Sequence, residues 1–294
     1  MKPNNLLPNK VAIITGGTTG IGRAITLAFL SQGCHVAVNH LPSSSSTDRS
    51  HIDSLLSEAA ALKSQYSSPS SSTSPSGITI GTLALLPGDI RLPSTGPSLI
   101  QFALQTFGTG RVDICVSNAG ICQFASFLDI SADLYSNTVR TNLDGAFYLV
   151  QAAARQMALH QSPPGGSIIG ISSISALVGG AEQAHYTPTK AGVLSLMQSA
   201  ACALGRYGVR CNALLPGTVE TQLNEKDLRR EGEEGGTKET GEKRRYMEGR
   251  IPLGRLGRPE DVSGPAVFLA SEELSGYVTG AQVLVDGGLF VNLQ

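Results

Sequence analysis

The chain has 294 residues, of which 41% are hydrophobic and 15% charged, so it can bury one large core. Lysine and arginine (22) almost cancel aspartate and glutamate (23), which excludes the basic surface that holds nucleic acid or anionic membranes. The 34 glycines and the absence of tryptophan favour an α/β protein with many tight turns. We therefore expect small-molecule partners.

Five widely spaced cysteines form no C-x-x-C pair that binds a metal: Cys34, Cys115, Cys122, Cys202 and Cys211. They are typical of buried thiols in a reducing compartment. The N-terminus lacks the apolar segment of a secretory signal, and no stretch reaches the roughly 18 apolar residues of a membrane helix. We expect a cytoplasmic protein without a metal site.

In the first half of the chain, strands alternate with helices. A buried strand is predicted at Val11–Ile14, then glycines, a helix from about Ile21 to Gly33, and a strand at Cys34–Val38. This is a βαβ unit with parallel strands. The next predicted elements are a strand at Ile78–Leu86, a helix at Leu99–Phe107, a strand at Val112–Val116 and a helix from Leu134 to about Gln161.

The alternation continues to the end of the chain. The predicted elements are a strand at Ser167–Ile171, a helix at His185–Tyr207, a strand at Arg210–Leu215, a helix at Pro259–Ala270 and a strand at Gln282–Val285. The pattern predicts one doubly wound Rossmann domain, residues 1–294, with a parallel sheet of about seven strands.

Two stretches interrupt this pattern. Residues 43–77 are rich in serine and proline around a modest helical piece at Ile52–Leu62, and residues 226–246 carry charge and glycine but almost no apolar side chains. Such compositions do not supply core. We predict that both are mobile insertions on the surface of the domain.

The first predicted strand runs into TGGTTGIG, at Thr15 to Gly22. In this context Gly16 permits the tight turn, Gly20 lets backbone approach a pyrophosphate, and Gly22 allows close packing of helix on strand. The helix N-terminus supplies unpaired N–H groups and a positive dipole end. The alternative is a glycine-rich connecting turn without a ligand.

The end of the second strand bears on the choice between the two nicotinamide cofactors. An acidic residue there binds the ribose 2′-hydroxyl, whereas a nearby cation accepts a 2′-phosphate. The chain has Asn39-His40-Leu41-Pro42 instead. Asn39 can bind the 2′-hydroxyl, and the serines from Ser43 can contact a phosphate, so these residues leave the selectivity open.

Small and polar residues also follow the next two strands. Asn118-Ala119-Gly120 lies where ligands bind in open α/β sheets, and Asp89 follows the third strand. Asp89 is either a turn carboxylate or a partner for an adenine amino group. Asn118 to Gly120 can equally form a simple turn.

Tyr186 and Lys190 are spaced to share one face of a helix. A free tyrosine has a pKa of about 10, but an adjacent ammonium favours its phenolate. Tyr186 then serves as a general base. The alternative is an ordinary solvated tyrosine–lysine pair.

The motifs TGGTTGIG, SNAG, ISS, YTPTK and LLPGTVET, with Asn142 between the second and third, stand in an order and spacing that resemble the short-chain dehydrogenase/reductase family. The resemblance covers the whole chain except the two insertions. It implies a catalytic set of Asn142, Ser173, Tyr186 and Lys190, with Ser172 supporting the backbone. It also implies cofactor contacts from Gly16, Gly20, Ile21, Gly22, Asn39, Asp89, Asn118, Gly120, Tyr186, Lys190, Pro216, Gly217, Val219 and Thr221.

Within the family, the segments GSIIGISSISALVGGAEQAHYTPTK, YMEGRIPLGRLG and GAQVLVDGGLFVNLQ resemble sugar 1-dehydrogenases that act on L-rhamnose. This implies oxidation of the anomeric carbon to a lactone with NAD, NADP being possible, and a homotetramer. The expected sugar contacts are Ser173, Ser175, Gln183 and Tyr186, with Gln123 and His185 as further candidates. The alternatives are a 3-oxoacyl reductase, a different aldose dehydrogenase, or a dinucleotide-binding scaffold without activity.

Overall fold

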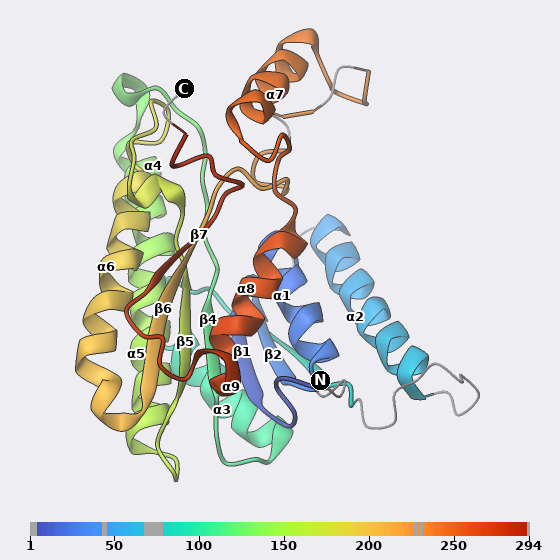
Figure 1. Ribbon diagram of the computed structural model, residues 1–294, viewed down its shortest axis with the longest axis vertical. Helices are drawn as coiled ribbons and strands as arrows, with labels where there is room; N and C mark the ends of the chain where they lie inside the picture. Colours follow the sequence, from blue (N-terminus) through green and yellow to red (C-terminus); the bar gives the residue numbers. More distant parts are fainter. Residues whose placement is uncertain (1–4, 43–45, 68–78, 226–227, 230–231, 293–294) are drawn as a thin grey trace.

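The computed structural model describes residues 5–42, 46–67, 79–225, 228–229 and 232–292. A single parallel sheet of seven strands forms its centre, in the order β3-β2-β1-β4-β5-β6-β7 (Figure 1). The strands are β1 Val11–Thr15, β2 His35–His40, β3 Leu83–Pro87, β4 Ile114–Ser117, β5 Gly166–Ile171, β6 Val209–Pro216 and β7 Gln282–Val285. The predicted doubly wound Rossmann fold is therefore confirmed.

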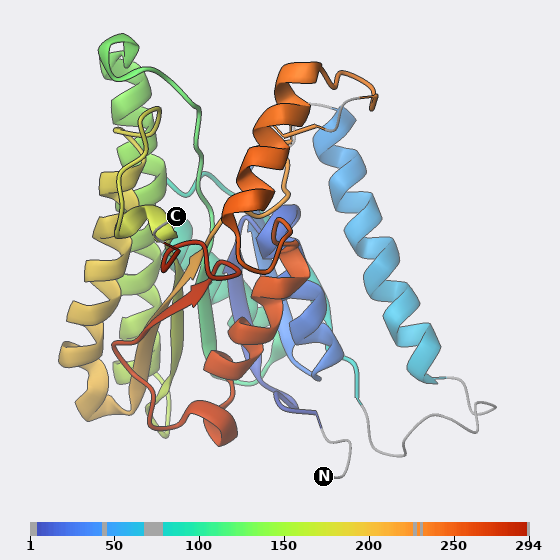
Figure 2. The ribbon, with the colours of Figure 1, turned by 45° about the horizontal axis from the view of Figure 1, so that its top comes forward.

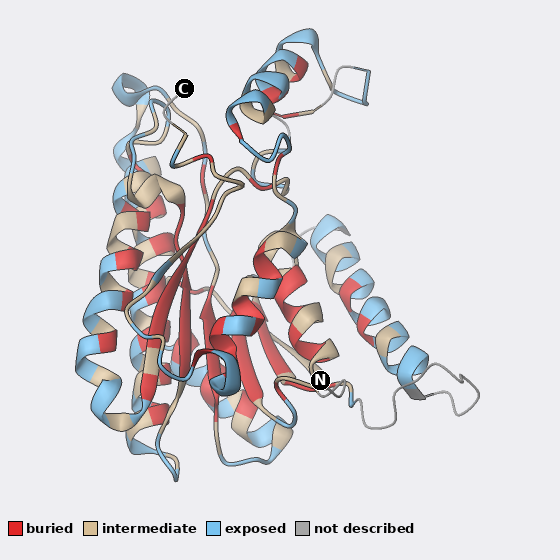
Figure 3. Cartoon of the chain, viewed as in Figure 1, coloured by how far each residue is buried: buried red, intermediate tan, exposed pale blue. Residues whose placement is uncertain are grey.

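The central strands form because their side chains are apolar on both faces, as a sheet covered by helices on both sides requires. Every residue of β1 and β4 is buried, and Figure 3 shows burial concentrated in the sheet. β1 pairs with β2 from Val11 opposite His35, and with β4 from Ala12 opposite Ile114. The strand order reverses between β1 and β4, the point where open α/β sheets bind ligands.

Helices cover both faces. The helices are α1 Gly20–Ser31, α2 Ser46–Ser67, α3 Thr95–Phe107, α4 Ala132–Val139, α5 Gly145–Leu159, α6 Thr187–Leu204, α7 Lys238–Arg250, α8 Pro259–Ala270 and α9 Glu272–Ser275. α1 and α8 pack on one face through Ile25, Phe29 and Val262. α3, α5 and α6 cover the other face, with Leu149 and Met197 in its core.

The predicted helix from Leu134 to about Gln161 is one helical stretch in three parts. Between α4 and α5, residues Arg140–Asp144 form a π-helix, and Asn142 lies inside it. Such wider turns occur mostly as single insertions within α-helices, often at functional sites. The π-turn places Asn142 beside the carboxyl end of the sheet.

The third strand begins later than predicted. Within the described residues, Gly81 bonds through its N–H to the Leu30 carbonyl at the end of α1, and a Cβ there would lie 1.7 Å from the Cys34 oxygen. This stretch therefore passes tightly under the turn before β2, and pairing with β2 begins only at Leu83. The position of Ile78 lies outside the described residues.

Both predicted insertions carry a helix. α2 spans Ser46–Ser67, twice the length of the expected piece, and lies on the outer side of α1 in Figures 1 and 2. α7 begins at Thr237, whose side chain accepts from the backbone N–H of Thr240 as a helix cap. The remainder of 43–77 and 226–246, including Ser43, lies partly outside the described residues.

The prediction of buried thiols is confirmed for four cysteines and wrong for Cys202, which is exposed. The buried stripe of α6 contains Val193, Met197 and Ala201, and Cys202 lies beside that stripe on the outer face. Among the described residues, no helix combines the length and apolarity needed to cross a membrane.

Candidate active site and dinucleotide cradle

The glycine-rich loop between β1 and α1 is closed by contacts that leave no space for side chains. Gly16 and Gly20 have φ angles of +63° and +52°, which favour glycine. A Cβ on Gly22 would lie 2.2 Å from the Gly16 carbonyl oxygen. Gly22 therefore packs against the loop itself, and the predicted helix–strand contact belongs to Gly17, where a Cβ would lie 2.8 Å from Val38.

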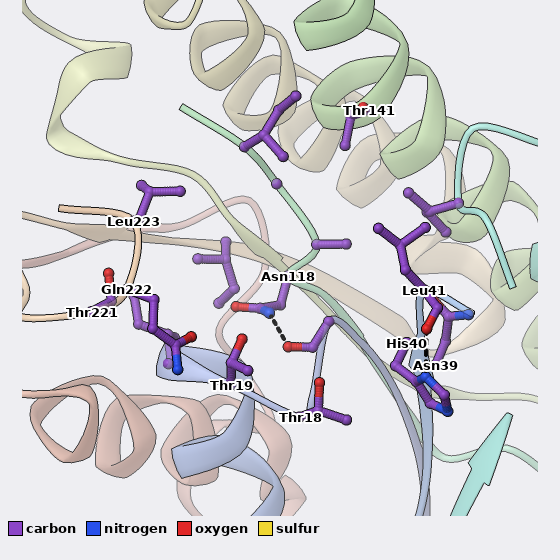
Figure 4. A pocket seen from close by; sticks show the side chains of 18 of the residues that line it. Thr18, Thr19, Asn39, His40, Leu41, Asn118, Thr141, Thr221, Gln222 and Leu223 are labelled. Carbon is purple, nitrogen blue, oxygen red and sulfur yellow. Dashed lines mark hydrogen bonds between the residues drawn. The ribbon is translucent and has the colours of Figure 1, made fainter. Parts of the chain in front are cut away.

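Asn118, at the end of β4, holds this loop in place (Figure 4). Its side-chain amide donates to the carbonyl oxygens of Thr15 and Gly16 at 2.9 and 3.1 Å. The Thr15 hydroxyl accepts in return from the backbone N–H groups of Asn118 and Ala119. These reciprocal bonds tie the first loop to the β4 terminus and shape the floor of the site.

A cavity of about 660 Å³ opens at the carboxyl ends of the strands, which we term the site cavity. In Figure 4, Thr18 and Thr19 of the glycine-rich loop face Thr221, Gln222 and Leu223 across it. The predicted residues that line it are Gly16, Gly20, Ile21, Asn39, Asp89, Asn118, Gly120, Ser173, Tyr186, Lys190, Pro216, Gly217, Val219 and Thr221. Residues from six separate loops thus meet at one place.

Four predicted residues do not line the site cavity: Gly22, Asn142, Ser175 and Gln183. The Gln183 amide donates to the Cys122 sulfur at 3.4 Å, and Ser175 donates its backbone N–H to the Ser173 hydroxyl. His185 is fully buried, and both ring nitrogens lack a hydrogen-bond partner in the described structure. The sugar contacts expected from Ser175 and Gln183 stay predictions.

Tyr186 and Lys190 lie one helical turn apart and both line the site cavity. Tyr186 immediately precedes α6, and the Lys190 ammonium lies 5.6 Å from the centroid of its ring. The same ammonium donates to the Ile171 carbonyl at the end of β5, at 2.9 Å. Lys190 is thereby directed across the sheet edge toward the end of β5.

Ser172 and Ser173 follow β5 and have different partners. The Ser172 hydroxyl is buried and donates to the backbone carbonyl of Lys190 at 2.7 Å, consistent with a role in backbone geometry. The Ser173 hydroxyl faces the site cavity and donates to the Pro216 carbonyl at 3.5 Å. Ser173 is thus the serine available to a ligand.

Asn142 lies behind the wall of the site cavity. Its carbonyl oxygen accepts from the Ile121 N–H at 2.8 Å, and its amide donates to the Ile121 carbonyl at 2.9 Å and the Thr189 hydroxyl at 3.2 Å. The side chain therefore clamps the stretch after Gly120 to α6. Its side-chain bonds are to protein groups on both sides.

Burial dominates the electrostatics of this pair. It raises the pKa of Tyr186 well above its usual value; the nearby Cys122 raises it further, while a hydrogen bond with Ser173 lowers it. Burial also lowers the pKa of Lys190 to about 8, with Cys122 acting in the opposite direction. The expected depression of the Tyr186 pKa by Lys190 is therefore not the net effect in this site.

At the far end of the site cavity, Asn39 is buried and its amide nitrogen donates to the carbonyls of Gly88 and Leu86, at 3.0 and 3.4 Å. The Asp89 carboxylate pairs with Arg91, at 2.6 Å, and this partner lowers its pKa. Arg91 also donates to the Asn137 side chain at 2.8 Å. Its charge is therefore compensated within the wall.

Further lining residues were not predicted from the sequence: Thr18, Thr19, His40, Leu41, Asp48, His51, Ile52, Gly88, Ile90, Arg91, Ala119, Ile121, Asn137, Thr141, Ile171, Ser172, Gln222, Leu223 and Asn224. Most are sequence neighbours of predicted positions, and this adjacency was the available signal. Asp48, His51 and Ile52 belong to α2, where a serine-rich composition concealed the start of the helix.

Comparison with known proteins agrees with this architecture. Residues 65–290 match the family model described as enoyl-(acyl carrier protein) reductase. A solved short-chain type dehydrogenase/reductase from Mycobacterium marinum superposes with a TM-score of 0.78 at 29% identity, covering 96% of each chain. The chain belongs to the short-chain dehydrogenase/reductase family.

Curated relatives match it over almost their whole length. L-rhamnose-1-dehydrogenase of Scheffersomyces stipitis is 54% identical, over 98% of this chain and 99% of the yeast protein. L-rhamnose 1-dehydrogenase (NAD(P)(+)) of Azotobacter vinelandii is 50% identical, over 98% of this chain and 100% of the bacterial protein.

The residues present fit a nicotinamide dinucleotide. The loop of Gly16 to Gly22 forms a cradle that a Cβ would fill, at the N-terminus of α1. A Cβ on Gly120 would lie 3.4 Å from the Lys190 nitrogen, so the absence of a side chain keeps open the space in front of that ammonium. Among the described residues, no group of three His, Cys, Asp or Glu side chains is placed to hold a metal.

Proposed function

We propose that this protein oxidises the anomeric carbon of L-rhamnose to L-rhamnonolactone and transfers the hydride to NAD(P)⁺. One observation carries the proposal: Ser173, Tyr186 and Lys190 line the same cavity as the glycine cradle. The identities of 54% and 50% to proteins named for this reaction support the choice of sugar. A dinucleotide-binding scaffold without activity has no need for these three side chains together.

In the proposed mechanism, Ser173 and Tyr186 bind the C1 hydroxyl of the sugar. The Ser173 hydroxyl positions the substrate oxygen, and the Tyr186 phenolate removes its proton. The C–H electron pair of C1 leaves as hydride while the carbonyl of the lactone forms. When bound, the oxidised nicotinamide accepts this hydride.

Lys190 and Asn142 support the base. The Lys190 ammonium lies near the Tyr186 ring and, by charge, stabilises the phenolate formed during turnover. Asn142 bonds to both backbone groups of Ile121 and thereby fixes the wall beside Lys190. The water path that the family resemblance assigns to Asn142 remains part of the proposal.

We propose NAD⁺ as the preferred cofactor, with NADP⁺ second. The Asn39 amide hydrogens are engaged by Gly88 and Leu86, so the side chain offers a carbonyl oxygen. Such an acceptor suits a ribose hydroxyl, which donates, better than a phosphate, which only accepts. Arg91, the nearby cation, is already paired with Asp89.

The test follows absorbance of reduced nicotinamide with a panel of aldoses and each cofactor in turn. L-rhamnose with NAD⁺ should give the largest kcat/KM. A larger value for another aldose would identify a different sugar dehydrogenase, and turnover of 3-oxoacyl thioesters alone would identify a reductase. Binding of NAD⁺ without turnover of any of these substrates would favour the scaffold.

We also propose a cytoplasmic homotetramer. All five cysteines are free, which suits a reducing compartment. Tyr135, Phe147, Leu159 and Val291 are exposed apolar side chains on the monomer, available for subunit contacts. Light scattering coupled to gel filtration should give four times the monomer mass; a monomer would contradict the proposal.

A further inference from the structure

α7 is a strongly charged helix that nevertheless buries an arginine. Its sequence, KETGEKRRYMEGR, has a single hydrophobic side chain besides Tyr246, and most of its residues are exposed (Figure 3). The Arg244 side chain is only 9% exposed. Burial of a guanidinium is costly unless it is paired and hydrogen-bonded, so its partners decide what the residue does.

Arg244 joins α7 to the segment that follows β6. Its Nη1 donates to Glu220 Oε1 at 2.5 Å and to the Leu228 carbonyl at 3.3 Å, and its Nε donates to Glu248 Oε1 at 2.9 Å. One cation is thus held between two carboxylates. Charge-assisted bonds of this kind are among the strongest side-chain hydrogen bonds.

Glu220 stands between two residues of the site cavity, Val219 and Thr221. Its backbone N–H bonds to the Gly257 carbonyl at 2.9 Å, and Asn224 bonds to Val219 and Thr221 on either side. A ligand that contacts this segment therefore acts on the backbone that carries Glu220. The link from cavity to α7 consists of one residue on each side.

The same helix reaches the other walls of the site cavity. Met247 packs against the apolar cluster of Leu228, Ile251, Leu256 and Leu289. Ile174, which directly follows Ser173, packs against the same cluster. On the opposite wall the Lys243 ammonium lies 5.3 Å from the ring centroid of Phe124, a few residues after Gly120.

We propose that Arg244 is a positioning residue that couples the dinucleotide segment Val219–Thr221 to α7, so that NAD⁺ binding fixes α7 over the sugar end of the cavity. A bound dinucleotide orders Glu220, Glu220 orders Arg244, and α7 then presses on Phe124 and Ile174. The sugar consequence rests on the proposed function; the coupling itself does not.

Hydrogen–deuterium exchange of the full-length protein, with and without saturating NAD⁺, tests the coupling directly. In the wild type, NAD⁺ should slow exchange of the α7 amides by on the order of 10-fold, within the usual range of coupling between sites. Glu220→Gln and Arg244→Gln should bind NAD⁺ but lose most of this protection. Arg244→Lys, which keeps the charge, should restore part of it.

The matched control is Glu242→Gln, which removes the partner of Lys238 in an exposed pair on the same helix. It should leave NAD⁺ protection unchanged. Protection of α7 that is absent in the wild type, or that persists in Glu220→Gln, would overturn the proposal. Glu220 is 41% exposed, so its variant should fold even if Arg244→Gln does not.

Kinetics give a second readout. The KM for L-rhamnose should rise by on the order of 10-fold in Glu220→Gln, with a smaller change in kcat, because the coupling positions substrate rather than the reacting groups. Equal loss in kcat and kcat/KM would contradict a positioning role. If no aldose is oxidised while NAD⁺-dependent protection is lost in Glu220→Gln, the proposed function fails and the coupling stands.

Discussion

The Lys190 ammonium lies 5.6 Å from the centre of the Tyr186 ring and donates to the Ile171 carbonyl at 2.9 Å. This one contact joins the start of α6 to the end of β5. Because both groups are buried, each resists its charged form, so their charges are most stable when they appear together. The predictions below begin from this pair.

Tyr186→Phe should lower kcat by about 10²–10⁴-fold, because it removes the group proposed to accept the substrate proton. The affinity for NAD⁺, measured by titration calorimetry, should stay within a few-fold of the wild type. Tyr207→Phe is the control, since its hydroxyl bonds only to exposed Arg206 beyond the end of α6. Unimpaired turnover in Tyr186→Phe would remove the proposed base.

The rate of sugar oxidation should increase with pH. Burial raises the pKa of Tyr186, so the phenolate fraction grows throughout the range below that pKa. Lys190→Met removes the neighbouring cation and should move the rise in kcat to higher pH. A pH–rate profile of both proteins checks this, and a shift toward lower pH in the variant would contradict it.

The stability of the protein should also report on Lys190. Its pKa falls from 10.5 to about 8 on burial, so between these values the unfolded chain binds more protons and stability rises with pH. From pH 7.5 to 9.5 the free energy of unfolding of the wild type should gain about 2 kcal/mol on Lys190→Met. Urea titrations of both proteins measure the difference; a constant difference would contradict the burial of the ammonium.

Gly22→Ala should abolish dinucleotide binding and destabilise the fold, because its Cβ would overlap the Gly16 carbonyl at 2.2 Å. Gly264→Ala is the matched control, since it lies inside α8 with no atom within 4 Å of a built Cβ. That change should stabilise the protein by roughly 0.5–1 kcal/mol. Thermal melts with and without NAD⁺ compare the two.

Asn118→Asp should impair NAD⁺ binding more than Asn118→Ala. The alanine variant loses two hydrogen bonds to the Thr15 and Gly16 carbonyls, whereas a carboxylate also places negative charge against these oxygens. The dissociation constant for NAD⁺ should rise about 10-fold in the alanine variant and further in the aspartate variant. The reverse order would show that the side chain contacts the ligand mainly by charge.

The sequence by itself determined the order of strands and helices and the residues with chemistry at strand ends. Apolar runs such as Val11–Ile14 are buried on both faces wherever a parallel sheet forms, so local composition suffices to find them. Motif spacing likewise brought Gly16, Ser173 and Tyr186 to one cavity, since the carboxyl ends of parallel strands share one edge.

Tertiary structure alone decided which of these side chains face the cavity and which hold its walls. Gln183 and Asn142 are spent on Cys122 and Ile121, partners distant in sequence, and α2 and α7 have compositions too polar to indicate contacts. Burial of the Tyr186 phenol outweighs its lysine neighbour for the same reason. Desolvation and hydrogen-bond partners depend on the whole fold around a residue, and no local pattern contains them.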